Sequence, residues 1–394
     1  MRRWYFSSES VTEGHPDKVA DAISDSVLDA VLAQDPEGRV ACEALVTTGR
    51  AVVAGEVTHR GEVDFETIAR QAIRDAGYTG VDGQFAADAV AVQVLIHAQS
   101  SEISAGVSES QESRGGSTDP LDEVGAGDQG IMFGFAVDET PELMPLPIQL
   151  AHRMAEALAA VRKDGTLPYL RPDGKTQVTV EYQDRRPVRV TSVLISAHHA
   201  PEVSIQGTME PDLWKHVVEE VVPPDLLDDD IPFYVNPSGR FEVGGPHADT
   251  GLTGRKIMVD TYGGYARVGG GCFSGKDPTK VDRSAAYAAR HAAKNVVAAG
   301  LASQCEIQLA YAIGQAAPFS TLLDTSGTSE VDPVKLERLV GEFFDFRPAA
   351  IIERLDLRRP IYRPTAVYGH FGRDGFSWEA TTQAGQLRAA ASSL

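Results

Sequence analysis

The sequence is poor in cysteine and contains no long apolar run. Its 394 residues include three cysteines, Cys42, Cys272 and Cys305, which lie far apart. This odd number of scattered thiols argues against both a disulfide framework and a zinc-binding ribbon. No apolar stretch approaches the ~20 residues of a membrane span. Only three apolar residues follow the arginines at the N-terminus, too few for a signal peptide. We therefore expect a soluble protein of the reducing cytoplasm.

Positive charge is also scarce. The chain has 36 lysines and arginines against 56 aspartates and glutamates, a net charge of −20. This excess argues against nucleic acid or an anionic membrane as the main partner, but a small anionic ligand remains compatible if cations are gathered locally. With 42% hydrophobic residues the chain is too apolar to be disordered. At about 150 residues per domain its length suggests two or three domains.

Cations are gathered in residues 253–294, which hold eight basic side chains against three acidic ones. A solvated face or a subunit contact could have this charge, but the segment also contains the glycine-rich stretch GGGCFSGKDP at 269–278. Asp277 and Pro278 are typical of the start of a helix, which we predict to run to about Ala299. A glycine-rich turn with a lysine at a helix N-terminus is a natural phosphate site. The stretch also fits GxxxxGK, but Asp277 replaces the Ser or Thr of a P-loop and no clear buried strand precedes it.

A second group of chemically capable residues begins the first predicted helix. After Gly14, apolar residues recur every four positions, at Val19, Ile23, Val27 and Val31. Pro16 suits the first helical turn, which places His15 and Asp17 at the helix N-terminus. A histidine there is more often a capping residue than a catalyst, yet together with Asp17 it could handle phosphate and a divalent metal. Asp282 is the expected second carboxylate for that metal. An acidic row continues along the helix and is expected to be mostly solvated: Asp21, Asp25 and Asp29.

The remaining pattern favours an α+β fold, because strands and helices do not alternate strictly. We predict strand structure at 42–57, 89–96 and 131–137, a hairpin over 178–195, helices at 68–76 and 148–161, a turn at 172–174 and a boundary at 222–230. Residues 125–130 fit GxGxxG, but a polar loop precedes them and an apolar run follows, so a dinucleotide site is not expected. Residues 100–124 are rich in serine and acid, which favours either a linker or a mobile functional loop.

Four segments carry a family resemblance: SESVTEGHPDKVADAISD, GAGDQGIMFGFA, GLTGRKIMVDTYGGYARVGGGCFSGKDPTKVDRSAAYAARHAAKN and YGHFGRDGFSWE. In order and spacing they resemble the bacterial S-adenosylmethionine synthetase (methionine adenosyltransferase) family. The resemblance implies a transferase that joins ATP and L-methionine: the sulfur attacks C5′ of ATP, intact triphosphate leaves, and the triphosphate is hydrolysed to diphosphate and phosphate.

The resemblance also implies the architecture. The family fold has three intertwined, similar α+β domains, each a sheet covered by helices on one face. The implied division is 2–99, 125–243 and 244–394, with 100–124 as a mobile loop that gates the active site. The implied assembly is a homotetramer, a dimer of dimers whose active sites lie at the dimer interface.

Site roles are implied only where residues match the family's motifs. Catalytic roles fall on His15, Lys175, Arg255 and Lys276. ATP contacts fall on His15, Asp173, Lys175, Arg240, Phe241, Asp249, Arg255, Lys256, Cys272 and Lys276. Methionine contacts fall on Glu56, Gln99, Asp128, Asp249 and Lys280. Two magnesium ions per site are associated with Asp17 and Asp282, and one potassium ion per subunit with Glu43.

The implied chemistry agrees with the charge pattern, because a multiply charged leaving group must be stabilised along its whole length. His15 would support the departing O5′ by electrostatics or hydrogen bonding. Two other interpretations stay open at this point. One is an ATP-dependent phosphotransferase or NTPase that uses GGGCFSGK as a P-loop. The other is a nucleotide-binding regulator that has lost catalysis.

Overall fold

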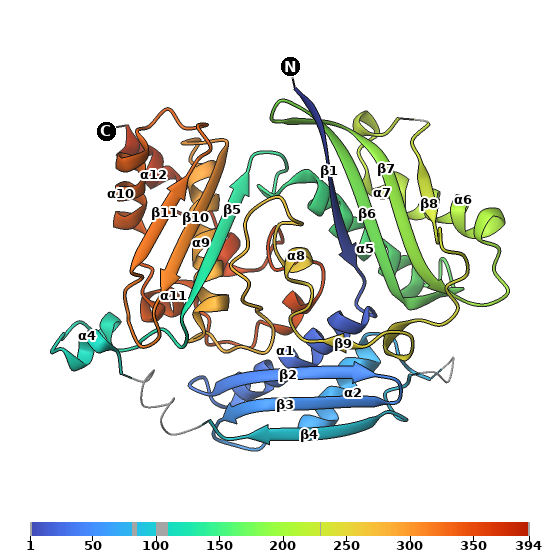
Figure 1. The fold of residues 1–394 in the computed structure, drawn as a ribbon, viewed down its shortest axis with the longest axis horizontal. Helices are drawn as coiled ribbons and strands as arrows, with labels where there is room; N and C mark the ends of the chain where they lie inside the picture. Colours follow the sequence, from blue (N-terminus) through green and yellow to red (C-terminus); the bar gives the residue numbers. More distant parts are fainter. Residues whose placement is uncertain (1, 81–84, 100–108, 229, 393–394) are drawn as a thin grey trace.

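The computed structural model describes residues 2–80, 85–99, 109–228 and 230–392. Three separate β-sheets surround the centre of the molecule (Figure 1). The first sheet has the order β1 (Arg3–Val11), β6 (Leu170–Gln183), β7 (Arg186–His199) and β8 (Phe233–Val235). The second has the order β4 (Ala91–His97), β3 (Arg50–Thr58), β2 (Arg39–Thr47) and β9 (Gly251–Leu252). The third has the order β11 (Ser320–Asp324), β10 (Gln304–Tyr311) and β5 (Gly130–Val137).

The three sheets are interleaved along the chain. β1 leaves the N-terminal stretch to pair with β6, β9 returns about 200 residues after β2 to pair with it, and β5 pairs with β10. Every sheet therefore takes a strand from a distant part of the sequence, as the intertwined α+β fold requires. The division of the chain into domains at 2–99, 125–243 and 244–394 stays a prediction.

Each sheet is covered by long helices on one face. α1 (Pro16–Gln34) packs on β2, α5 (Leu146–Lys163) packs on β1 and β6, and α9 (Val281–Ala298) packs on β5 and β10. Further helices complete these layers: α2 (Phe65–Asp75), α10 (Pro333–Phe343), α11 (Pro348–Leu355) and α12 (Ala384–Ala391). One apolar core joins the second and third sheets with their helices, and another lies between α5 and the first sheet.

Most predicted elements occur where the sequence placed them. The four-residue repeat after Pro16 forms α1, the predicted strand at 42–57 is the hairpin of β2 and β3, and the predicted hairpin is β6 with β7. The turn predicted at 172–174 is wrong. Pro172, Asp173 and Gly174 belong to β6, where the pairing register shifts between Leu170 and Gly174. Proline and glycine occur at irregularities inside long strands as well as in turns, so the same sequence pattern fits both structures.

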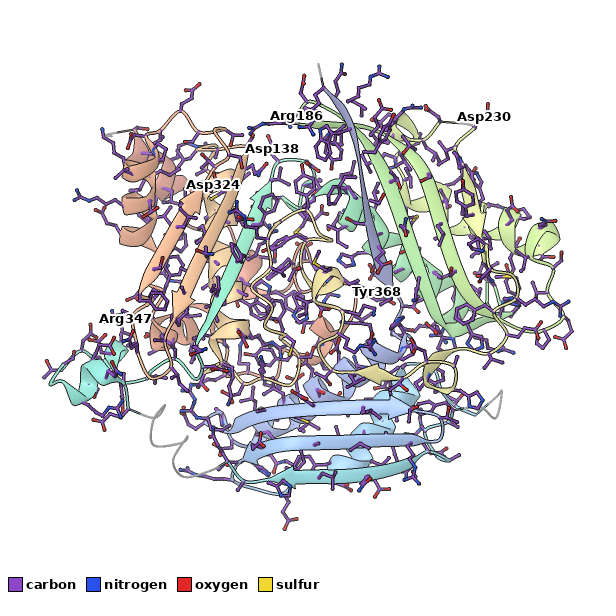
Figure 2. The ribbon with its side chains drawn as sticks, in the orientation of Figure 1. Asp138, Arg186, Asp230, Asp324, Arg347 and Tyr368 are labelled. Atoms are coloured by element: carbon purple, nitrogen blue, oxygen red, sulfur yellow. The ribbon has the colours of Figure 1, made fainter. Side chains whose placement is uncertain are left out.

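The serine- and acid-rich segment is structured in its described part. Residues 100–108 lie outside the described residues, whereas α4 (Gln111–Arg114) follows them. Glu112 accepts hydrogen bonds from the backbone N–H groups of Ala316 and Ala317, at 2.9 and 3.2 Å. Arg347 lies beside α4 (Figure 2) and pairs with Asp119 and Asp122 at 2.8 and 2.7 Å. This end of the segment is therefore tied to the third sheet's side of the molecule.

No helix in the described part of the chain is both long and apolar enough to cross a membrane.

Candidate active site

A neutral histidine lies at the start of α1. His15 is the N-cap residue, and its Nδ1 accepts a hydrogen bond from the backbone N–H of Asp17 at 3.2 Å. Because Nδ1 accepts, the single ring proton of neutral His15 lies on Nε2. Burial, together with the ammonium groups of Lys256 and Lys175, lowers the pKa of His15 to about 3. The ring is therefore a neutral Nε2–H donor at physiological pH.

Asp17 gathers cations around this histidine. Its Oδ2 pairs with Lys256 Nζ at 2.5 Å, and its Oδ1 accepts from the backbone N–H of Leu252 at 3.0 Å. Arg255 lies 3.5 Å from the same carboxylate. Burial raises the pKa of Asp17, but the hydrogen bonds from Lys256 and Leu252 hold it below its usual value.

Lys175 reaches this region from β6, where it pairs in register with the residue that ends β1. We call His15, Asp17, Lys175, Arg255 and Lys256 the His15 group.

The irregular part of β6 places a second carboxyl group near this group. Asp173 is buried, and its Oδ2 accepts from the backbone N–H of Gly245 at 2.9 Å, whereas its Oδ1 has no hydrogen-bond partner among the described residues. Burial raises the pKa of Asp173 to about 6. The segment before Gly245 carries Arg240, which is exposed and pairs with Glu242, and Phe241, whose ring stacks on His198 with centroids 5.4 Å apart. A flat apolar surface beside a polar edge suits a nucleoside.

The glycine-rich loop, residues 269–276, carries a separate set of residues. Lys276 Nζ pairs with Asp282 Oδ2 at 2.5 Å. A Cβ on Gly271 would lie only 2.2 Å from Asp282 Oδ1, so glycine lets this carboxylate lie against the loop. Burial lowers the pKa of Lys276, but Cys272 and Asp282 raise it, so the net pKa is above its usual value. We call Asp128, Cys272, Lys276 and Asp282 the Lys276 group, because the electrostatic influence on Lys276 also includes Asp128.

The helix predicted to begin at Pro278 starts later. α9 begins at Val281 with Lys280 as its cap residue. Asp277 is fully buried and instead binds the backbone N–H groups of Val40 and Thr279, at 2.7 and 2.9 Å. Its carboxylate also pairs with Lys280 at 2.5 Å. Lys276 is therefore not presented on a helix N-terminus, which removes the main structural argument for a P-loop.

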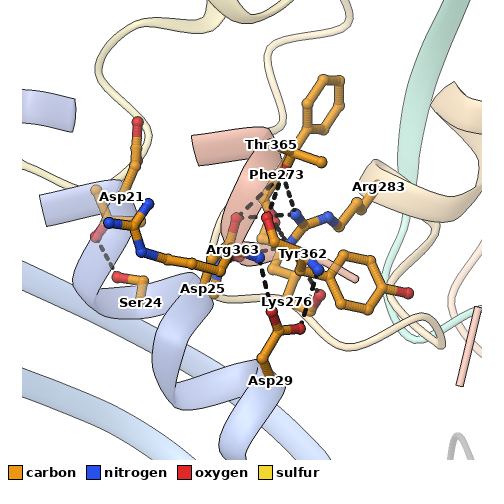
Figure 3. Close-up of polar contacts among 12 residues, drawn as sticks. Asp21, Ser24, Asp25, Asp29, Phe273, Lys276, Arg283, Tyr362, Arg363 and Thr365 are labelled. Atoms are coloured by element: carbon orange, nitrogen blue, oxygen red, sulfur yellow. Dashed lines mark hydrogen bonds and ion pairs between the residues drawn. The ribbon is translucent and has the colours of Figure 1, made fainter. Parts of the chain in front are cut away.

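The acidic row on α1 is bonded within the fold rather than solvated: Asp21 and Asp25 are buried and Asp29 is half-buried. Asp21 accepts from the backbone N–H of Gly254 at 2.8 Å, and its carboxylate pairs with Lys18 at 2.7 Å. Asp25 and Asp29 bind other loops in the same way (Figure 3). The sequence interpretation missed these residues, although their spacing of four from Asp17 puts all of them on one face of the helix.

Three further predicted residues lie on or next to the second sheet, and Asp249 is exposed just before β9. Glu43 on β2 and Glu56 on β3 are exposed. Cys42, the neighbour of Glu43 on β2, is buried on the face that α1 covers. Since neighbouring residues on a strand alternate between faces, both carboxylates lie on the open face, away from α1. Gln99 follows β4, and its backbone N–H donates to Thr58 Oγ1 at 3.1 Å. These residues do not meet the His15 group within the described contacts.

One chain thus holds two groups of site residues that do not touch. Across the described residues, no hydrogen bond or ion pair links the His15 group with the Lys276 group. Each group contains one lysine–carboxylate ion pair, Lys256 with Asp17 and Lys276 with Asp282.

The donor chemistry fits magnesium bound together with phosphate. The described residues contain no cluster of three or more histidine, cysteine, aspartate or glutamate side chains that could hold a metal by themselves. Magnesium, however, is commonly held by one or two carboxylates plus substrate phosphates. Asp17 and Asp282 offer one carboxylate each, and both are already held against cations.

The sequence matches one known family along almost the entire chain. Family models of S-adenosylmethionine synthetase match in three parts: the N-terminal domain at residues 3–101, the central domain at 123–241 and the C-terminal domain at 243–380. An S-adenosylmethionine synthase of Desulforudis audaxviator is 59% identical over 392 residues, which cover 99% of both chains. One of Roseiflexus castenholzii is 59% identical over 395 residues, covering 99% of this chain and 97% of the relative. With the interleaved sheets and the two lysine–carboxylate groups, these matches show that the chain belongs to the S-adenosylmethionine synthetase family.

Proposed function

We propose that the His15 group and the Lys276 group act together in the reaction of this family. The chain is a methionine adenosyltransferase: it forms S-adenosyl-L-methionine from ATP and L-methionine. The sulfur attacks C5′, intact triphosphate leaves, and the triphosphate is then hydrolysed to diphosphate and phosphate. The assignment of roles rests on one observation: His15 is a neutral histidine that caps α1 and lies among lysine and arginine side chains. That arrangement suits the breaking of a C–O bond to a polyanion.

His15 supports the departing oxygen. A neutral imidazole with its proton on Nε2 can donate a hydrogen bond to O5′ as negative charge develops there. The hydrogen bond from the backbone of Asp17 to Nδ1 holds the ring and its tautomer before ATP arrives. Such preorganised donors stabilise charge that forms in the transition state more than charge present beforehand.

The cations hold the triphosphate. Lys175, Arg255 and Lys256 supply positive charge on one side, and Lys276 supplies it on the other. A leaving group that carries charge along its length needs donors at both places. Before substrate binds, Asp17 and Asp282 neutralise Lys256 and Lys276 and keep these side chains in place.

Two magnesium ions would be held by Asp17 and Asp282 with phosphate oxygens, and one potassium ion by Glu43. Magnesium supplies charge neutralisation of the triphosphate when bound. The carboxylate of Asp17 would hold the ion, and the ammonium group of Lys256 beside it would bind phosphate.

Substrate recognition uses the exposed carboxylates and the nucleoside surface. Phe241 with Arg240 and Asp173 would bind the adenosine, with Cys272 beside the phosphates. Methionine needs an anion for its ammonium group, for which Glu56, Asp128 and Asp249 are exposed. Its carboxylate would be bound by Gln99 and by Lys280, which shares its charge with Asp277.

The active enzyme would be a homo-oligomer, a dimer of dimers in the cytoplasm. Two observations support a shared site: the two groups do not meet in one chain, and the sheets expose apolar side chains on their uncovered faces. Exposed apolar residues on these faces include Tyr5, Leu95, Ile131, Leu252 and Leu322. A second copy laid on these faces would cover them and bring the Lys276 group of one chain to the His15 group of the other.

A P-loop phosphotransferase is not supported. The glycine-rich loop leads into a turn closed by Asp277 rather than into a helix, so the backbone N–H groups that cradle phosphate in a P-loop are not arranged here. The family matches also leave no reason to propose a catalytically inactive regulator.

The test is one incubation with ATP, L-methionine, magnesium and potassium, analysed by mass spectrometry and phosphate release. We expect S-adenosylmethionine, diphosphate and phosphate, and none of these when methionine is left out. ADP formed without methionine would overturn the proposal in favour of phosphoryl transfer. Omitting magnesium and potassium separately tests each ion, and unchanged turnover without one would remove it.

A further inference from the structure

We propose that Asp25 and Arg283 form a positioning pair that holds the glycine-rich loop, and with it Lys276, in the geometry for phosphate binding. The inference rests on the proposed role of Lys276 and adds two residues that contact no substrate. Asp25 lies on α1 and Arg283 on the first turn of α9, so the pair joins parts of the chain that are 258 residues apart.

Asp25 binds both the loop and the arginine. Its Oδ1 accepts from the backbone N–H of Gly275 at 2.8 Å and from Arg283 Nη1 at 2.7 Å. Its Oδ2 accepts from Arg283 Nη2 at 2.9 Å (Figure 3). The side chains of both partners are at most 1% exposed, so this two-bond ion pair is withdrawn from water. Such paired contacts fix orientation as well as distance.

Arg283 holds the loop at further points. Its Nη1 lies 3.0 Å from the carbonyl oxygen of Phe273 and 3.4 Å from that of Lys276. Its Nη2 donates to Thr365 Oγ1 at 2.9 Å. Together with the contact of Asp25 at Gly275, the pair binds the loop backbone on both sides of Ser274 and directly at Lys276.

The loop has little freedom to settle elsewhere. Gly275 has φ = 78°, a left-handed conformation that favours glycine, and a Cβ there would lie 1.8 Å from the carbonyl oxygen of Cys42. The backbone N–H of Cys42 also donates to the carbonyl oxygen of Gly275 at 2.9 Å. The loop is thus pressed between β2 and the buried ion pair, and the direction of the Lys276 side chain depends on both.

The same helix provides a matched control. Asp29, one turn beyond Asp25, accepts from the backbone N–H groups of Tyr362 and Arg363 at 2.9 and 2.8 Å. Asp29 thus also binds a loop, but among the described residues it forms no hydrogen bond or ion pair with the glycine-rich loop. Asp29→Asn therefore removes a carboxylate from α1 that binds the backbone at 362–363 rather than that of the glycine-rich loop.

The experiment is a double-mutant cycle between Asp25→Asn and Lys276→Ala in the full-length enzyme. For Asp25→Asn we expect KM for ATP and for added tripolyphosphate to rise roughly tenfold, a size that a small misplacement of a binding group can produce. The KM for methionine should change less than twofold. In the Lys276→Ala background, Asp25→Asn should cause no further rise in the tripolyphosphate KM, because the group it positions is gone.

Asp29→Asn should lower the melting temperature and leave both KM values unchanged. Equal KM effects of Asp25→Asn and Asp29→Asn, or additive effects of Asp25→Asn and Lys276→Ala, would overturn the positioning role. If Lys276→Ala by itself leaves tripolyphosphate binding intact, the proposed role of Lys276 is wrong. That result is distinct from a failure of Asp25.

Asp25→Asn leaves the Arg283 charge buried without its partner and can therefore prevent folding. The double variant Asp25→Asn, Arg283→Gln removes both charges together and keeps polar groups at both positions. In this variant the tripolyphosphate KM should still rise. A folded double variant with wild-type KM values would refute the proposal.

Discussion

His15 has two roles at one position. As the N-cap of α1 it satisfies the backbone N–H of Asp17, and this contact leaves its Nε2–H free to donate. The burial and the neighbouring lysines that lower its pKa remove any role for a cationic imidazole. A capping role and a catalytic role, which seemed to be alternatives, are therefore the same arrangement.

His15→Asn tests this directly. Asparagine is also a good N-cap, so the start of α1 should survive. Without an Nε2–H placed at O5′, adenosyl transfer should slow by about a hundredfold or more. Hydrolysis of added tripolyphosphate should change much less, since no bond to O5′ breaks in that step. Single-turnover rates of the two steps provide the measurement, and equal losses in both would contradict the role at O5′.

A second buried histidine links stability to pH. His152 Nδ1 lies 2.8 Å from Ser10 Oγ, and burial, with smaller contributions from Arg373 and Lys18, lowers the pKa of His152 to about 3. Below pH 6.5 the unfolded chain binds a proton at this residue that the folded protein excludes. The contribution of His152 to stability is therefore fully present above pH 6.5 and falls as the pH decreases towards 3.

His152→Gln should expose this linkage. The variant should be less stable than the wild type at pH 7.5, because glutamine packs less well in the cavity. Its deficit should shrink by up to about 1.4 kcal/mol per pH unit below 6.5, since only the wild type must keep this group unprotonated. Urea unfolding at pH 7.5, 6.5 and 5.5 measures the difference. A deficit that stays constant over this range would show that folding does not lower the pKa of His152.

At the scale of elements, α1 organises the site. Its N-terminus carries His15 and Asp17, its second turn holds the 251–256 segment through Asp21, and its third turn holds the glycine-rich loop through Asp25. One helix thereby sets the relative position of two loops that bring most of the cations. This explains why the carboxylates on α1 are buried in a chain whose surface is already strongly acidic.

The segment after β4 is the other element that bears on function. Its role as a gate stays a prediction, and residues 100–108 lie outside the described residues. Its described end is fastened by Arg347, which also pairs with Asp345 at 2.6 Å. The whole anchor lies near the surface, so it should hold the segment without contributing much to global stability.

Arg347→Ala should therefore loosen residues 109–124 while changing the melting temperature only slightly. Trypsin should then cut faster after Arg114, which lies in α4. Limited proteolysis followed by mass spectrometry measures the rate. Arg338→Ala is the matched control, because Arg338 forms an exposed pair with Glu342 on α10 and should not affect cleavage at Arg114. Unchanged cleavage in Arg347→Ala would show that other contacts hold the segment.

At the scale of the whole molecule, the uncovered faces of the sheets bear on how the chain would assemble. Leu95 on β4 is 43% exposed and pairs in register with Ala54, which in turn faces Glu43 across β2 and β3. Apolar side chains and the proposed ligand residues therefore share one face. Contiguous exposed apolar surface commonly marks an interaction site.

Leu95→Glu should weaken the proposed dimer by placing a charge in its interface. We expect a shift towards monomer in sedimentation velocity, with activity that recovers as protein concentration increases. Val334→Glu is the control: Val334 on α10 is 78% exposed but lies away from the open faces. If Leu95→Glu sediments like the wild type, this face is not the interface.

Local signals in the sequence determined the elements and the identity of most site residues. The proline and the four-residue repeat specified α1 and placed His15 and Asp17 at its start, because capping and periodicity depend on near neighbours. The family resemblance supplied the remaining ligand residues. Tertiary structure alone decided that Asp21 and Asp25 are buried and Asp29 half-buried, since the N–H groups they bind come from segments more than 200 residues away. Tertiary structure also decided that Asp173 lies within β6 rather than in a turn, and that α9 begins at Val281 rather than at Pro278. In both places long-range pairing, with β7 and with β2, overrode turn and capping signals that were valid only locally.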